Sequence, residues 1–208
     1  MDYNLPRQQR PESASSADIV GWLAEAWKLF KKNAPAYVIS ALLFIAVMLL
    51  SQFIPYVGGI LVTGPIMVGL YLVIGDQLEG RDFDAARIFA GFSYFVPAFM
   101  ANLIITIFST VGFFLLIVPG IIIGSWYLFT FLFIIDRDMD FWAAMEASRQ
   151  VAFNDIIGFA FFYATLIGLN AIGFLLFAVG LFITIPVSAI AVFVAYNRLV
   201  GSQKLTLA

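Results

Sequence analysis

The sequence contains no cysteine and no histidine. Thiol nucleophiles, imidazole acid–base catalysis and metal sites built from Cys or His are therefore excluded. Charge is also scarce, because charged residues make up 12% of the 208 residues and the formal net charge is −2. A chain with this charge balance has no electrostatic basis for binding nucleic acid, and we expect no nucleic-acid partner.

Hydrophobic residues, by contrast, make up 62% of the chain. Ordinary globular chains contain roughly 45–50% apolar residues and about 25% charged residues. A soluble domain of this length could not bury so much apolar surface. The solvent for most of the chain is therefore lipid, and the composition predicts a membrane protein.

Six apolar stretches are long enough to cross a hydrocarbon core of roughly 30 Å, which takes a helix of about 20 residues. The stretches are continuous rather than alternating, and this favours helices over a β-barrel. The predicted spans are 34–54, 57–75, 93–116, 119–135, 156–178 and 181–197. The predicted fold class is thus an all-α membrane protein with six transmembrane helices.

The charged residues are confined to one set of connections. The 11 basic and 13 acidic side chains lie in the N-terminal region, in the loops 76–87 and 136–155, or in the C-terminal tail. The other three connections carry no charge. Because basic residues favour the cytoplasmic side of a membrane, the pattern predicts a multi-pass protein whose N- and C-termini are both cytoplasmic.

The first and last thirds of the chain repeat one another at a constant offset. The offset relates Glu25 to Glu146, Asn33 to Asn154, Gly59 to Gly180, Pro65 to Pro186 and Gly80 to Gly201. A looser middle copy lies between them. We therefore predict one membrane domain over 18–201 with three repeats, at about 18–80, 81–137 and 138–201. Residues 1–17 are expected to form a disordered cytoplasmic tail and 202–208 a second cytoplasmic tail.

Each repeat is predicted to consist of an interfacial amphipathic helix followed by a transmembrane hairpin. The amphipathic segments are 18–32, 82–92 and 140–154, with Asp18, Asp82 and Asp140 as N-caps. Each contains an acid followed three residues later by a base. These pairs, the candidate interfacial or partner surface, are Glu25–Lys28, Asp84–Arg87 and Glu146–Arg149. Two interpretations remain open: an interfacial anchor with intrahelical pairs worth about 0.2–0.5 kcal/mol, or a docking surface for a cytoplasmic partner.

No ionisable side chain lies deep inside a predicted span, which disfavours a proton-driven carrier. Asn102 and Asn170 are the candidate intramembrane polar residues. They could line a polar cavity, or they could form interhelical hydrogen bonds worth about 0.6 kcal/mol on average. Pro65 and Pro186 could break their helices as prolines do in transporters, but we expect them at a turn or at the first helical position.

The acidic residues Asp136, Asp138 and Asp140 alternate as the first ligands of an EF-hand do. That loop requires Gly at its sixth position and Glu at its twelfth, where this sequence has Phe141 and Ala147. We interpret the segment as an acidic cytoplasmic loop with a helix cap. The sequence thus predicts no metal site, no cofactor and no catalytic residue.

Several motifs resemble a bacterial family of integral membrane proteins. The resembling residues are Val118-Pro119-Gly120, Trp126, Asp136, the stretch 141–149, Pro186 and Ala195-Tyr196-Asn197-Arg198. The family includes the membrane domain attached to some glycerophosphoryl diester phosphodiesterases. The resemblance implies a protein of the bacterial cytoplasmic (inner) membrane. It implies no catalysis, because the sequence has no His/Glu metal cluster.

These features favour a non-enzymatic membrane protein over an enzyme. We expect a role in membrane organisation, lipid handling or partner scaffolding through the cytoplasmic-side amphipathic helices. The alternative is a permease-like transporter of an apolar or amphiphilic solute. Membrane lipids are the expected partners, while a cytoplasmic protein partner and a homo-oligomer both remain open.

Overall fold

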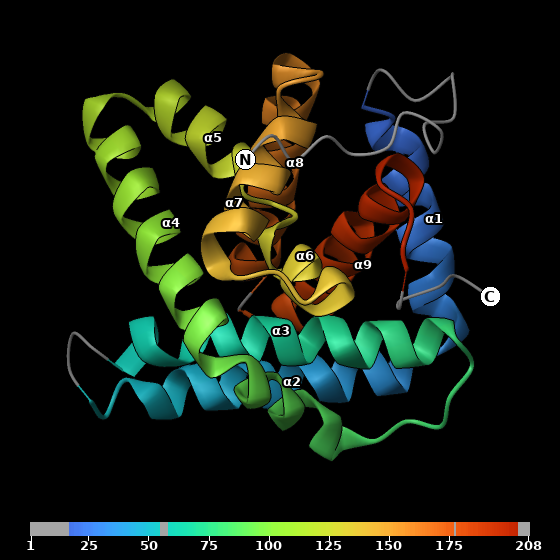
Figure 1. Cartoon of the computed structure of the whole chain (residues 1–208). Coiled ribbons are helices and arrows are strands. Elements are labelled where there is room, and N and C mark those ends of the chain that lie inside the picture. The colour runs from blue at the N-terminus through green and yellow to red at the C-terminus, as the bar shows by residue number, and fades with distance from the viewer. Residues whose placement is uncertain (1–16, 55–57, 177, 204–208) are drawn as a thin grey trace.

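The computed structural model describes residues 17–54, 58–176 and 178–203 (Figure 1). Within these ranges all regular secondary structure is helical. In chain order the elements are α1 (Ile19–Lys32), α2 (Ala34–Ser51), α3 (Gly58–Leu78), η2 (Ala85–Tyr94), α4 (Phe95–Leu115), α5 (Ile117–Trp126), α6 (Thr130–Arg137), α7 (Phe141–Ala152), α8 (Ile156–Leu175) and α9 (Leu181–Leu199). Most of the two predicted tails, residues 1–16 and 204–208, falls outside the described residues.

Six helical segments are long and apolar enough to cross a membrane, as the sequence predicts. They are Ala34–Ser51, Gly58–Leu78, Ala85–Phe114, Ile117–Arg137, Ile156–Leu175 and Leu181–Leu199. Their ends differ from the predicted ends by a few residues, except that the third segment also takes in η2. The chain is therefore an all-helical, multi-pass membrane protein.

One predicted span is not a continuous helix. The stretch 119–135 was expected to be one helix, but α5 ends at Trp126 and α6 begins at Thr130. The turn between them contains short-range hydrogen bonds, from Tyr127 N–H to Gly124 O and from Thr130 N–H to Tyr127 O. The prediction of a continuous helix is wrong. At this turn the side chain of Ser148, on α7, forms hydrogen bonds with the backbone in place of helical bonds.

The spans pair into hairpins that fold back on themselves, with small residues where the helices meet. In the α4–α5 hairpin, a Cβ on Gly112 would lie 3.0 Å from the Cα of Gly120. In the α8–α9 hairpin, a Cβ on Gly173 would lie 2.4 Å from Thr184 Oγ1. Close approach of backbones is how helices gain contact in lipid, where the hydrophobic effect does not drive them together.

The centre of the molecule is formed by α3, α6 and α9. Among the spans α3 and α9 are the most buried, whereas most residues of α2 and α8 are not buried inside the protein. Aromatic rings join α6 to α9, since Tyr196 meets Phe129 and Phe133 edge-on at 5.7 and 5.1 Å between ring centroids. These contacts place the end of α9 against the broken span.

Both interior prolines lie inside helices, contrary to the expectation of a turn or first helical position. Pro65 is within α3 and Pro186 is within α9, and both are buried. The helix η2 lies directly on α3 at Pro65, where a Cβ on Gly91 would come within 2.1 Å of Pro65 O. A proline inside a helix leaves the carbonyl four residues earlier without its helical hydrogen bond. At Pro65 the neighbouring helix η2 covers the backbone of α3.

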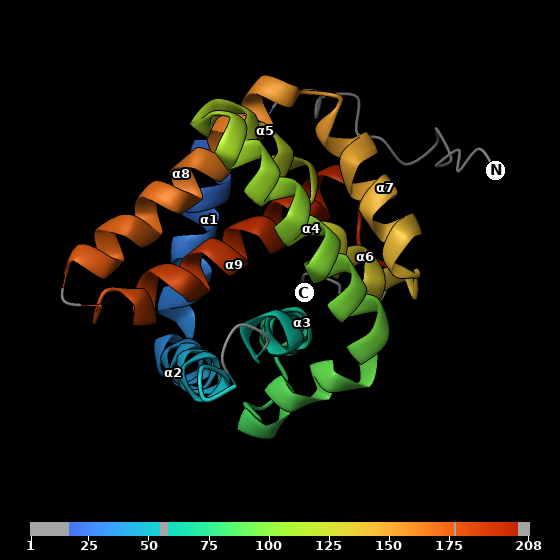
Figure 2. The same ribbon diagram turned by 90° about the vertical axis from the view of Figure 1, so that its left-hand side faces the viewer.

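The three connecting segments form α1, η2 and α7. Asp18 caps α1 by accepting from Gly21 N–H at 2.9 Å, and Asp140 caps α7 by accepting from Ala143 N–H at 2.9 Å, as predicted. The predicted cap Asp82 is wrong, because η2 begins later and Asp84 accepts from Ala86 N–H instead. In both views α1 runs across the direction of α2 and α3 (Figures 1 and 2).

Candidate functional site

The acid–base pair predicted within α7 is formed. Glu146 Oε1 lies 2.6 Å from Arg149 Nη2, and Glu146 Oε2 accepts from Arg149 Nε at 2.9 Å. This hydrogen bond holds the pKa of Glu146 below its ordinary value, and the same contact raises the pKa of Arg149. The Arg149 guanidinium also lies 4.7 Å from the ring centroid of Phe153. The pair therefore belongs to α7 and joins it to no other span.

The pair predicted within α1 is wrong. Glu25 Oε2 accepts from Arg198 Nη2 at 3.0 Å, so this acid joins α1 to the end of α9 rather than to Lys28. The reason is tertiary, because α1 packs against α9. Both side chains are partly exposed, and the ion pair is worth at most about 1 kcal/mol.

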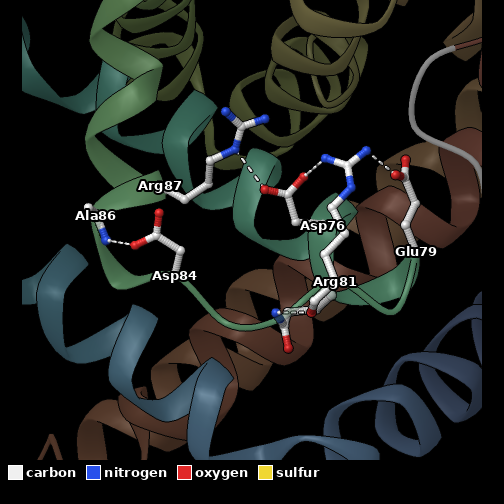
Figure 3. A network of polar contacts seen from close by, with 7 residues as sticks. Asp76, Glu79, Arg81, Asp84, Ala86 and Arg87 are labelled. Carbon is white, nitrogen blue, oxygen red and sulfur yellow. Dashed lines mark hydrogen bonds and ion pairs between the residues drawn. The ribbon is translucent and has the colours of Figure 1, made fainter.

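The pair predicted within 82–92 is also wrong, because its two members have different roles. Asp84 serves as the helix cap, while Arg87 Nε donates to Asp76 Oδ2 at 2.7 Å (Figure 3). Asp76 stands near the end of α3 and accepts a second bond from Arg81 Nη1 at 2.5 Å. Arg81 also pairs with Glu79. The centre of this network is Asp76, which ties the end of α3 to the start of η2.

Three lysines on α1 face outward. The helix buries Trp22, Ala26 and Phe30, whereas Lys28, Lys31 and Lys32 are exposed. Trp27 is 44% exposed beside them, with Lys31 Nζ 5.8 Å from its ring centroid. In the described part of the chain none of these three lysines forms an ion pair. This lysine face is the group of charges that internal contacts do not use.

A carboxylate that the sequence placed in an acidic loop is fully buried. Asp136 is 0% exposed and accepts from Tyr196 Oη at 2.8 Å, Ser202 Oγ at 2.9 Å and Gln203 N–H at 2.9 Å. Arg137 Nε lies 3.7 Å from the same carboxylate. Asp136 thus holds α6, α9 and the residues after α9 together. Its neighbour Asp140 is exposed and caps α7, so the alternating aspartates do not converge.

The two intramembrane asparagines serve different helix pairs. Asn102 on α4 is 7% exposed and donates from Nδ2 to Ile60 O on α3 at 3.1 Å. Asn170 on α8 donates to Ser188 Oγ on α9 at 2.9 Å and to Leu166 O at 2.9 Å. Each asparagine therefore forms an interhelical hydrogen bond, and nothing in these contacts brings the two together around a cavity.

Ser148 on α7 is a residue that no sequence pattern singled out. Its hydroxyl is 1% exposed, accepts from Phe129 N–H at 3.1 Å and donates to Trp126 O at 2.7 Å. The hydroxyl thereby forms hydrogen bonds with the last carbonyl of α5 and with the amide just before α6. Non-helical backbone at membrane depth is tolerated where protein satisfies its polar groups, and Ser148 performs this for the break.

In the described part of the chain, no group of three or more acidic residues is placed to hold a metal ion. The contacts above engage most of the described charges in helix caps or in pairs, either within one helix or between two, whereas the lysine face of α1 forms no ion pair among the described residues. No protein-family model, curated protein or solved structure matches this sequence.

Proposed function

We propose that this chain is a non-enzymatic multi-pass protein of the bacterial cytoplasmic membrane that organises anionic lipids. The observation that carries the proposal is the lysine face of α1, formed by Lys28, Lys31 and Lys32 next to Trp27. The one acid in the middle of that helix, Glu25, is engaged by Arg198, which leaves the three lysines without a counter-ion among the described residues. Anionic headgroups are the complementary partner that a membrane supplies in abundance.

The position of α1 supports this assignment. The helix turns its apolar side to the protein and runs across the direction of α2 and α3 (Figures 1 and 2). A helix lying along a membrane surface places lysines at headgroup level and an amphipathic indole ring beside them. Each lysine near an anionic surface contributes about 1 kcal/mol, so the face contributes about 3 kcal/mol at low salt.

A docking surface made of the predicted acid–base pairs is less well supported. Arg87 is engaged by Asp76, and Glu146 and Arg149 engage one another. A protein partner would have to break these pairs to use them. Asn102 and Asn170 are likewise occupied in holding helices together, which favours lipid organisation over transport.

We also propose the three-repeat architecture, in which each repeat has an interfacial amphipathic helix and a hairpin. Two features support it besides the constant offset. Gly80 and Gly201 occupy equivalent positions after α3 and α9, and both have φ of +73°. Pro65 and Pro186 occupy equivalent positions inside the same two helices. A glycine with left-handed backbone conformation at the equivalent position of each repeat is what we expect if both repeats keep the same turn after the helix.

The charge distribution supports a cytoplasmic location for both termini, since the basic side chains lie at one set of connections. The sequence resemblance supports the bacterial inner membrane. We propose on the same grounds that the chain is a relative of the membrane domains attached to some glycerophosphoryl diester phosphodiesterases. The lipid-organising role does not depend on that relationship.

The test measures the preference of the protein for anionic over zwitterionic lipid. The protein is reconstituted in phosphatidylcholine nanodiscs, and spin-labelled phosphatidylglycerol and phosphatidylcholine are compared as first-shell lipids. Replacing Lys28, Lys31 and Lys32 together by glutamine should reduce the relative affinity for phosphatidylglycerol by about a hundredfold.

Two matched variants serve as controls. The triple Lys→Arg protein keeps the charge and should keep the preference, whereas Arg149→Gln removes one charge from α7 and should change it little. An unchanged preference in the triple glutamine protein would contradict the proposal. An equal loss of the preference for phosphatidylglycerol in the triple arginine protein would also contradict it, because the positive charge of α1 would then not be the cause of the preference.

A further inference from the structure

We propose that the tips of the α4–α5 and α8–α9 hairpins lie within the lipid of the far leaflet and do not reach water. The tips stand at the opposite ends of these helices from the charged connections. This inference concerns a surface different from the lysine face, and it does not depend on the proposed function. It rests on three properties of the tips: their side chains, their backbone hydrogen bonds and the lengths of the helices.

The side chains at the tips are large, apolar and strongly exposed. In the α4–α5 connection Phe114 is 90% exposed, and Leu116 and Ile117 are each 69% exposed. At the α8–α9 connection Leu175 is 78% and Leu176 61% exposed. The sequence contains no charged residue in either connection. In water such contiguous apolar patches are avoided, whereas in hydrocarbon they cost nothing.

Part of the backbone at each tip is hydrogen-bonded within the chain. Leu116 N–H donates to Gly112 O at 3.1 Å, and Gly120 N–H donates back to Leu116 O at 3.3 Å. At the other tip Ala178 N–H donates to Phe174 O at 2.9 Å, and Leu181 N–H donates to Ala178 O at 3.1 Å. Turns in water often form such bonds as well, so the bonds are compatible with either solvent. In hydrocarbon an unsatisfied amide costs several kcal/mol, so internal bonding is the form that lipid requires.

The helix α8 has no length to spare. The 20 residues of α8 correspond to about 30 Å of helix, which is roughly the thickness of the hydrocarbon core. The 10 residues of α5 reach only about 15 Å beyond the break in the fourth span.

Lipid fits these tips better than a protein partner does. The two tips lie apart from one another in Figure 2. A second copy or a partner chain would need a separate complementary surface for each, whereas acyl chains cover any apolar shape. The tips also offer no charged group by which a protein partner could be oriented.

The chain contains no cysteine, which permits a direct test with single-cysteine variants. We would attach a nitroxide at Phe114→Cys, at Leu176→Cys and at the control Asp82→Cys, which is exposed in the charged loop before η2. Electron paramagnetic resonance in proteoliposomes then measures collisions with oxygen, which concentrates in lipid, and with a polar nickel complex, which stays in water. Both tip positions are strongly exposed, so the substitution should leave folding intact.

Lipid-embedded tips should give high oxygen and low nickel accessibility at both positions, and the control should give the reverse. High nickel accessibility at the tips would overturn the proposal in favour of water. Low accessibility to both reagents would overturn it in favour of a protein contact. A polar maleimide should also label the unmodified tip cysteines at least about tenfold more slowly than the cysteine of the Asp82→Cys control, because thiolate forms poorly in lipid.

Discussion

Replacing Ser148 by alanine should destabilise the protein by breaking the link between α7 and the interrupted fourth span. One hydroxyl serves both Phe129 N–H and Trp126 O, at 3.1 and 2.7 Å, and it is buried. A buried amide without a partner costs about 1–3 kcal/mol, and a lost hydrogen bond to a carbonyl costs about 0.5–1.5 kcal/mol. The free energy of unfolding should therefore fall by about 1.5–4.5 kcal/mol.

Ser125→Ala is the matched control. Ser125 is also 1% exposed and also donates to a carbonyl, that of Ile122 at 2.7 Å, but this carbonyl lies on its own helix and no amide depends on the serine. Its loss should lower the free energy of unfolding by less than about 1 kcal/mol. The two variants remove the same atom at equal burial. The difference between their free energies of unfolding therefore measures what the Ser148 hydroxyl contributes at the break between α5 and α6.

The assay is equilibrium unfolding of the purified protein in mixed micelles, combined with hydrogen exchange at Phe129. Loss of about 1.5–4.5 kcal/mol from a local opening should accelerate exchange of that amide by about tenfold to two-thousandfold. Exchange in the middle of α9 should change less. If Ser148→Ala is no more destabilising than Ser125→Ala, or if exchange at Phe129 is unchanged, the hydroxyl does not support the break and the reasoning is refuted.

Two further predictions concern packing and pH. Gly69→Ala should destabilise the protein by about 1–3 kcal/mol, because the added Cβ would come within 1.7 Å of Ile88 O on η2. Gly168→Ala, whose Cβ would meet nothing within 4 Å, should be neutral or slightly stabilising in the same thermal-unfolding assay, and equal losses would contradict the packing argument. The folded-state pKa of Glu146 lies below its ordinary value of 4.5, so the Glu146–Arg149 pair should stabilise the protein fully above pH 4.5 and lose its effect as pH falls through the folded-state pKa. The difference in melting temperature between the wild type and Glu146→Gln should therefore shrink only below pH 4.5, and a change between about pH 6 and 8 would contradict it.

Local features of the chain were predictable because each depends on a few neighbouring residues. A span needs only an apolar run of sufficient length, and a cap such as Asp18 or Asp140 needs only an amide three residues further on. The N-cap of η2 could not be predicted from neighbouring residues alone. Asp82 and Asp84 are both suitable by type, and the choice of Asp84 accompanies an extended loop whose Arg81 is held by Asp76.

The partners of the charged residues were not predictable in the same way. Glu25 has Lys28 one turn away, yet it pairs with Arg198, which is distant in sequence and close only because α1 packs against α9. The energy of an intrahelical pair is a few tenths of a kcal/mol, so a neighbouring helix end easily supplies a competing partner. Helix packing, rather than spacing along the chain, decided which ions meet.

The sequence by itself determined the solvent of this protein, the number of its spans and the confinement of its charge to one set of connections. These properties follow from the composition and from the order of residues along the chain, and neither depends on how the helices pack. The tertiary structure alone decided that Asp136 is buried, that the fourth span is broken at a place served by Ser148, and that the lysines of α1 are left facing outward. Each of these depends on which helices meet, and a buried polar group is stable only where another element brings its partner.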